Sequence, residues 1–196
     1  MATILKVARA PLAAFAAMGV VWGTFAAALP DIKTMLAVNE AQLGVLLLFT
    51  PLAAVAAMLL APAFGAAMGR MALPLAAVVM GLGIALPGQS ANLLVFALAM
   101  MVCGAGTGLT DVLMNARVAE LENTRKIHLM NLCHAAYSFG YAGAAIATGV
   151  MRGAGWGPGG PGFYGPVSRG SRGAAGLGGG GGGGGGGRGR KRGAGG

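Results

Sequence analysis

Long stretches without a charged side chain alternate with short polar segments along the first 151 residues. Four charge-free runs cover 10–30, 41–69, 71–110 and 127–151, and they contain 21, 29, 40 and 25 residues. A helix needs about 20 apolar residues to cross the hydrocarbon core of a bilayer. The 40-residue run is long enough for two helices, and its polar, breaker-rich segment at 87–92 predicts a turn. We therefore expect five transmembrane helices, at about 10–30, 42–66, 71–87, 92–114 and 129–151.

The composition supports a membrane protein of the all-α class. Hydrophobic residues make up 56% of the chain and charged residues only 10%, against about 25% charged in an ordinary soluble domain. A soluble globule of this size needs a charged surface that these residues cannot supply. Helices satisfy their own backbone groups inside a bilayer, so the apolar runs predict helices rather than open strands.

The distribution of Lys and Arg predicts that the N-terminus is cytoplasmic. With that orientation only Lys33 lies in an outer segment. Six basic residues lie in inner segments, which follows the positive-inside rule: Lys6, Arg9, Arg70, Arg117, Arg125 and Lys126.

Small residues four apart predict close contacts between helices. The pattern GxxxG occurs at 19–23, 65–69 and 104–108, and such stripes let helix backbones approach each other. In the first and fourth helices the stripe is followed by an aspartate, Asp31 or Asp111. This likeness indicates repeated three-helix units, which are common in secondary transporters.

Asp111 is the most informative candidate for function. A carboxylate within or against the hydrocarbon is costly and marks a functional site by default. The alternative is an acid just inside the interface that Arg117 or water satisfies. Asn115 lies one turn later on the same helix, so it is a second candidate for the polar pathway.

Polar residues also share one face of the fifth helix. His134, Tyr137 and Tyr141 are spaced three and seven residues apart, so they could line a polar cavity. The alternative is a histidine that bonds a neighbouring helix. Trp22 in the first helix either lines the same cavity or simply packs. The sequence has no metal-ligand cluster, phosphate loop or nucleophile elbow, so we expect neither an enzyme nor a cofactor.

Three segments carry a resemblance to a known family. They are Gly108-Leu109-Thr110-Asp111-Val112-Leu113-Met114-Asn115-Ala116, His134-Ala135-Ala136-Tyr137-Ser138-Phe139-Gly140 and Gly19-Val20-Val21-Trp22-Gly23. With them, residues 1–151 resemble the N-terminal half of a major facilitator superfamily transporter, in the bacterial inner-membrane branch of fucose-permease-like proteins. The resemblance implies secondary transport of a small polar solute, with a proton as the candidate coupling ion, in a fold of twelve helices. Five helices correspond to a half that is truncated after its fifth.

The family's gating loop after the second helix is only partly kept. Gly65 and Arg70 match its glycine and the arginine five residues later, which makes them gating-loop candidates. The acid expected just before that arginine is replaced by Gly69, and later positions are Ala72 and Pro74. This departure leaves open whether the loop gates a pathway here.

Residues 152–196 differ from the rest of the chain. They contain 24 of the 38 glycines, seven basic residues and no acid, so we expect a disordered, low-complexity tail. A nucleic-acid-binding arm is one alternative, but the predicted outer location argues against nucleic acid as a partner. The abrupt change to residues with GC-rich codons favours the product of a shifted reading frame. A membrane fragment that does not transport, or that binds a partner half, is the alternative function.

Overall fold

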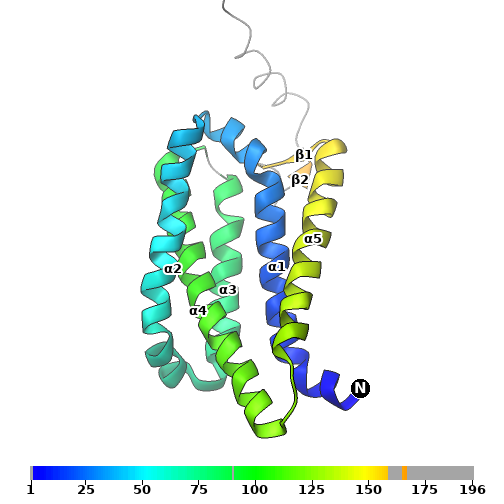
Figure 1. Ribbon diagram of the computed structural model, residues 1–196. Helices are drawn as coiled ribbons and strands as arrows, with labels where there is room; N and C mark the ends of the chain where they lie inside the picture. Colours follow the sequence, from blue (N-terminus) through cyan, green and yellow to red (C-terminus); the bar gives the residue numbers. More distant parts are fainter. Residues whose placement is uncertain (1, 90, 159–164, 167–196) are drawn as a thin grey trace, which may run out of the picture.

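The computed structural model is a bundle of long helices (Figure 1). It describes residues 2–89, 91–158 and 165–166, without the side chains of 2–7 and 165–166. Two single 3₁₀ turns, η1 (Gly69–Met71) and η2 (Pro87–Gln89), lie on either side of the third helix. In the described part of the chain the α-helices are α1 (Ala2–Leu36), α2 (Glu40–Met68), α3 (Ala72–Ala85), α4 (Leu93–Arg125) and α5 (Met130–Gly153).

Three segments of the described chain are long and apolar enough to cross a membrane: Ala8–Leu36, Glu40–Gln89 and Leu93–Arg125. The second contains both α2 and α3, since η1 joins them with little interruption. The helix α5 is not among the three, and it carries Asn131, His134 and two tyrosines within its 24 residues. The structure therefore supports a helical membrane protein, but the predicted count of five spans is not confirmed.

Most helices extend beyond the bounds that the charge-free runs predict. Pro30 does not end α1, which continues to Leu36, and the Thr34 hydroxyl bonds the Pro30 carbonyl at 3.0 Å. The helix α4 continues eleven residues past the predicted end at 114, through the charged segment that ends at Arg125. At about 1.5 Å per residue α4 is longer than the roughly 30 Å hydrocarbon core, so its last turns lie outside it.

Side-chain caps fix where α2 and α4 begin. The Asn39 side chain accepts from the Gln42 amide at 2.9 Å, and the Gln42 side chain accepts from the Asn39 amide at 3.0 Å. The Asn92 side chain accepts from the amides of Leu94 and Val95. These bonds satisfy amides that the first helical turn leaves without partners.

The helix α5 ends at Gly153, two residues beyond its predicted end. Arg152 forms a two-bond ion pair with Asp31 of α1, with N···O distances of 2.7 and 3.0 Å. Beyond it, β1 (Trp156–Gly157) pairs antiparallel with β2 (Gly165–Pro166). The rest of the predicted disordered tail, 159–164 and 167–196, lies outside the described residues.

Two of the three predicted glycine stripes are helix contacts. A Cβ atom at Gly19 would lie 2.1 Å from the Tyr137 carbonyl oxygen, and one at Gly23 would lie 2.2 Å from that of Tyr141. The backbones of α1 and α5 therefore touch along this stripe, which only glycine permits.

The same arrangement recurs between α4 and α2. A Cβ at Gly104 would lie 2.1 Å from the Thr50 carbonyl oxygen, and one at Gly108 would lie 2.3 Å from that of Ala54. In both pairs, two glycines four residues apart meet two carbonyls four residues apart. This match supports the predicted likeness between the first and fourth helices.

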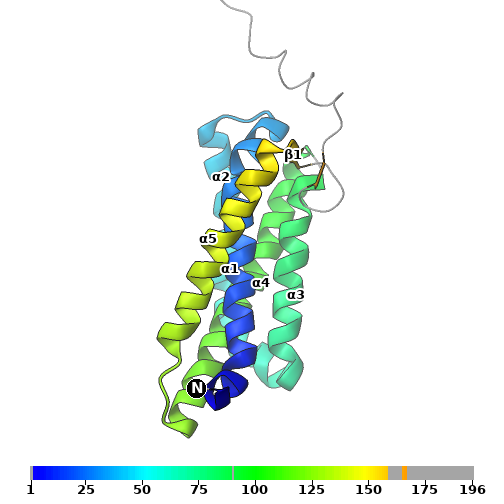
Figure 2. The same cartoon turned by 90° about the vertical axis from the view of Figure 1, so that its right-hand side faces the viewer.

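The third stripe, 65–69, does not bring two helix backbones together, because Gly65 meets only the Leu113 side chain of α4. Gly69 ends α2 with a φ of +52°, and a Cβ there would meet nothing within 4 Å. The prediction for this stripe was wrong because the helix ends inside the pattern. Instead α3 packs against α4 through Gly83 and Gly106, which approach the backbones of Cys103 and Met80. Figure 2 shows α3 and α5 on opposite sides of α1 and α4.

The outer surface of the bundle is apolar. Only 17% of the most apolar window in Glu40–Gln89 is buried, and Leu59 and Phe139 are about 80% exposed. Contiguous apolar surface of this kind is rare on soluble monomers. It fits contact with lipid.

Candidate functional site

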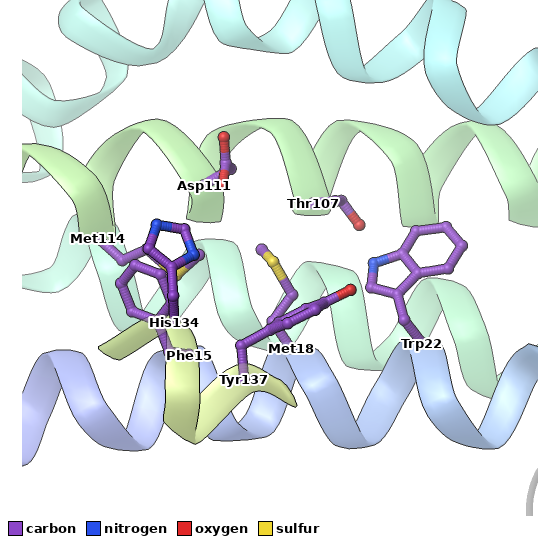
Figure 3. A pocket seen from close by; sticks show the side chains of 8 residues that line it. All are labelled: Phe15, Met18, Trp22, Thr107, Asp111, Met114, His134 and Tyr137. Carbon is purple, nitrogen blue, oxygen red and sulfur yellow. The ribbon is translucent and has the colours of Figure 1, made fainter. Parts of the chain in front are cut away.

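A cavity of about 330 Å³ lies between α1, α4 and α5 (Figure 3). Each helix contributes residues spaced three or four apart, so each presents one face to the cavity. The lining residues are Phe15, Met18 and Trp22 from α1, Thr107, Asp111 and Met114 from α4, and His134 and Tyr137 from α5. Four of the predicted site residues, Trp22, Asp111, His134 and Tyr137, therefore meet in one cavity.

Asp111 is held by its own helix. The Asn115 amide donates to the Asp111 side-chain carboxylate at 3.1 Å and to its backbone carbonyl at 2.8 Å. Asn115 does not line the cavity itself but contacts Asp111, which does, and its role in the pathway stays a prediction. The alternative partner, Arg117, bonds Glu120 at 2.5 Å on the exposed side of α4. Among the described residues no cationic side chain pairs with Asp111.

His134 and Tyr137 form the α5 wall of the cavity. The His134 ring meets the ring of Phe15 edge-on, with centroids 5.1 Å apart, and its backbone carbonyl accepts from Ser138. The His134 side chain is exposed, so this end of the cavity is open. Tyr141 does not line the cavity; its ring lies 6.2 Å from that of Tyr137.

Polar atoms from three helices point into the other end of the cavity. Figure 3 shows the Thr107 hydroxyl, the indole nitrogen of Trp22 and the Tyr137 hydroxyl on the Trp22 side of the cavity. Asp111 and His134 lie nearer Met114. The cavity thus has an ionisable end and an end with uncharged polar groups.

Trp22 also borders a second cavity, of about 290 Å³, between α1, α2 and α4. This second cavity shares Trp22 and Thr107 with the first. Trp22 packs against two clusters of buried apolar residues, one around Phe25 and Phe96 and the other around Phe15 and Met18. Its ring meets that of Phe25 edge-on, with centroids 5.9 Å apart. Trp22 therefore borders both cavities as well as packing, and its role in the pathway stays a prediction.

The gating-loop candidates lie away from both cavities. Gly65 packs near Leu113 of α4, and a Cβ there would lie 3.1 Å from the Leu113 methyl carbon. Arg70 is exposed in η1 and forms no ion pair within the described part of the chain. Their role in gating stays a prediction.

Sequence reasoning missed several lining residues. Thr107 and Met114 lie on the same face of α4 as Asp111, one turn before and one turn after it, and helical spacing alone could have identified them. Phe15 and Met18 lie two turns and one turn before Trp22 on the same face of α1. Thr50 and Pro51 of α2 line the second cavity, and no spacing to a charged residue marks them.

Glu122 organises the α4–α5 connection. Its carboxylate accepts from the backbone amides of Leu129 and Met130, at the start of α5. These hydrogen bonds hold the pKa of the Glu122 carboxyl below its ordinary value of 4.5. The chain turns at Lys126, whose φ is +54°, so His134 is placed by a short, capped connection.

The residues of the described segments contain no group of three His, Cys, Asp or Glu side chains that could hold a metal ion. Cys103 and Cys133 are both buried and not paired in a disulfide. The polar side chains that line the cavity are those of Asp111, His134, Tyr137, Thr107 and Trp22. Such a set can bind a polar solute or exchange a proton.

Comparison with known proteins supports the membrane assignment. The chain is 30% identical over 135 residues to the membrane protein MosC of Rhizobium meliloti. The aligned region covers 68% of this chain and 33% of MosC. The chain thus spans about a third of the length of this relative. No family model matches the chain, and no solved structure matches it. With the apolar spans described above, this similarity identifies the chain as a helical membrane protein.

Proposed function

We propose that this chain forms one wall of the solute pathway of a secondary transporter of the major facilitator type. One observation carries the proposal: Asp111 and His134 face a cavity between helices whose outer surfaces are apolar. Placing two ionisable side chains among apolar membrane helices costs free energy, and such residues mark a substrate or ion pathway. A cavity of about 330 Å³ is of the size that takes small-molecule ligands, which supports a small solute.

The internal repeat supports the same proposal. The glycine contacts of α1 with α5 and of α4 with α2 have the same spacing, as expected of two related helical units. Transporters built from repeats bind solute where the units meet and alternate access by rocking one unit against another. Both α1 and α4 line the cavity.

Asp111 is the residue that we assign to proton coupling. Its carboxylate has Asn115 as its hydrogen-bonding neighbour and no cationic partner among the described residues. A carboxylate without a fixed counter-charge can take up and release a proton as its surroundings change. His134 lines the same cavity and is the second group that can carry a proton.

The alternative is a membrane protein that does not transport and only packs against a partner. In that case the cavity would be filled by a partner side chain or by lipid, and Asp111 would have no contact with water. The proposals therefore differ in whether position 111 is reached from the aqueous phase.

Cysteine accessibility distinguishes the two. In a background with alanine at Cys103 and Cys133, Asp111→Cys in liposomes should react with a membrane-impermeant charged thiol reagent. Leu59→Cys is the matched control, because Leu59 is 79% exposed on the lipid-facing surface of α2 and should stay unreacted. Equal absence of labelling at both positions would refute a water-filled pathway and favour the packing alternative.

A further inference from the structure

The second cavity is lined by apolar residues and by two threonines. It measures about 290 Å³ and lies beside the first cavity, across Trp22. Its apolar lining residues are Trp22, Phe25, Leu47, Pro51 and Ala54, and its polar ones are Thr50 and Thr107. None of the described residues that line it is charged.

Both threonine hydroxyls lack a hydrogen-bond partner that would compensate for their burial. Thr50 is only 7% exposed, and neither its Oγ1 nor that of Thr107 has an oxygen or nitrogen partner in the described structure. The nearby thiol of Cys103 gives Thr107 at most a weak bond. A buried hydroxyl without a partner costs free energy, so native proteins supply one from protein, water or ligand.

Pro51 adds a third polar group near the same place. Proline has no amide hydrogen, so the Leu47 carbonyl, four residues earlier, loses its helical donor. Leu47 lines the cavity as well. The carbonyls of Thr50 and Ala54 lie against Gly104 and Gly108, which fixes α2 against α4 at this level. The hydroxyls are therefore held in a rigid frame.

We propose that the second cavity is an uncharged subsite of the solute pathway, in which Thr50 and Thr107 bind a neutral hydroxyl or amide group of the solute. Trp22 separates this subsite from the ionisable compartment at Asp111 and His134. This inference rests on the proposed function, since it assigns one end of the transported solute to each compartment.

The chemistry of the lining selects the kind of group. A charged group that entered the second cavity would lose its hydration and meet no counter-charge, which is strongly unfavourable. A hydroxyl or amide can donate and accept at once, as two threonine hydroxyls require. The apolar rings of Trp22 and Phe25 add surface for the carbon skeleton beside it.

The test uses Thr50→Cys in the background with alanine at Cys103 and Cys133, reconstituted in liposomes. Four methanethiosulfonates are compared: the neutral hydroxyethyl and methyl reagents, the cationic trimethylammonium-ethyl reagent and the anionic sulfonatoethyl reagent. We expect the hydroxyethyl reagent to react at least about tenfold faster than either charged one. Adding Thr107→Val should lower the reaction rate of the hydroxyethyl reagent about three- to tenfold, which is the effect of losing one hydrogen bond. The reaction rate of the methyl reagent should stay unchanged.

Thr110→Val is the matched control. Thr110 also lies on α4, and its hydroxyl is fully buried and has no hydrogen-bond partner in the described structure. Unlike Thr107, it lines neither cavity. It should leave all four rates unchanged. Charged reagents that react as fast as neutral ones, or a Thr107→Val effect equal for both neutral reagents, would overturn the subsite.

The experiment separates this inference from the proposed function. Labelling of Asp111→Cys but not of Thr50→Cys removes the second subsite and leaves the pathway intact. Failure of both positions to react removes the pathway and the subsite together. Each variant is checked for a monodisperse elution profile and an unchanged helical circular dichroism signal, so that unfolding is not mistaken for a result.

Discussion

Asp111 and Glu122 lie three turns apart on α4, and their surroundings differ. Asp111 faces a cavity and has one amide neighbour, Asn115. Glu122 lies beyond the predicted span and accepts two backbone amides at the start of α5. Backbone donors stabilise the charged form of a carboxylate, so Glu122 serves structure, whereas Asp111 has the position that our proposed pathway requires.

The cap at Glu122 predicts a pH-dependent stability. The folded-state pKa of Glu122 is lowered from 4.5. The ionised carboxylate therefore contributes fully to the free energy of unfolding above pH 4.5, and this contribution disappears as the pH falls through the folded-state pKa. Glu122→Gln should therefore unfold at a lower temperature than the unmodified chain at pH 7, and the difference should vanish at low pH. Thermal unfolding in detergent, followed by circular dichroism, measures both.

The control for this prediction is Glu120→Gln. Glu120 also lies near the end of α4, but its partner is the exposed Arg117 side chain, and such pairs contribute little. We expect Glu120→Gln to lower the unfolding temperature at pH 7 by less than Glu122→Gln does. A Glu122→Gln deficit that is equally large at both pH values would contradict the cap.

At the residue scale, the sequence predicted Asp111 and His134, together with Trp22 and Tyr137, but not the two threonines. Asp111 and His134 stand out because charge is rare in apolar helices. Thr50 and Thr107 do not, because threonines in such helices often bond their own backbone. Only the packing of α2 against α4 shows that these two hydroxyls share a cavity without partners.

At the scale of elements, the glycine stripes determine which helices pair. Gly104 and Gly108 bring α4 against α2, and Gly19 and Gly23 bring α1 against α5. The sequence predicted the stripes but not which helix each stripe contacts, because the contacting groups are backbone carbonyls that every residue has. It also extended the pattern to Gly69, where the helix had already ended.

Gly104→Ala tests the α2–α4 contact. The added methyl group would lie 2.1 Å from the Thr50 carbonyl oxygen, so the helices must separate. We expect a loss of about 1–3 kcal/mol in the free energy of unfolding, as for other overpacked sites. Gly143→Ala on α5, where nothing lies within 4 Å, should cause no loss. Unfolding in mixed detergent micelles compares the two, and equal stability would show that the stripe is not a tight contact.

Helix bounds were predicted less well than helix positions. Charge-free runs mark the part of a helix that lies in hydrocarbon, but α1 and α4 continue into segments that carry charge. The last turn of α5 carries Arg152, whose partner Asp31 lies 121 residues earlier in the chain. Contacts over such distances cannot be inferred from local pattern.

At the scale of the whole molecule, the helices form one unit with a cavity on it. The cavities lie along α1 and α4, flanked by α5 on one side and α2 on the other. Alternating access requires a second unit that rocks against the first around a central site. The arrangement therefore supplies one wall of the proposed pathway.

The final prediction concerns transport by the purified chain. In liposomes that contain this chain alone, a panel of radiolabelled small polar solutes should show no saturable uptake under an imposed proton gradient, since the described helices form one of the two units that alternating access requires. The assay is sensitive: a coupled proton at 100 mV supplies about 2.3 kcal/mol, enough to concentrate a solute about fiftyfold. Saturable uptake that Asp111→Asn abolishes would contradict this prediction, because copies of the chain would then have to supply both walls around Asp111.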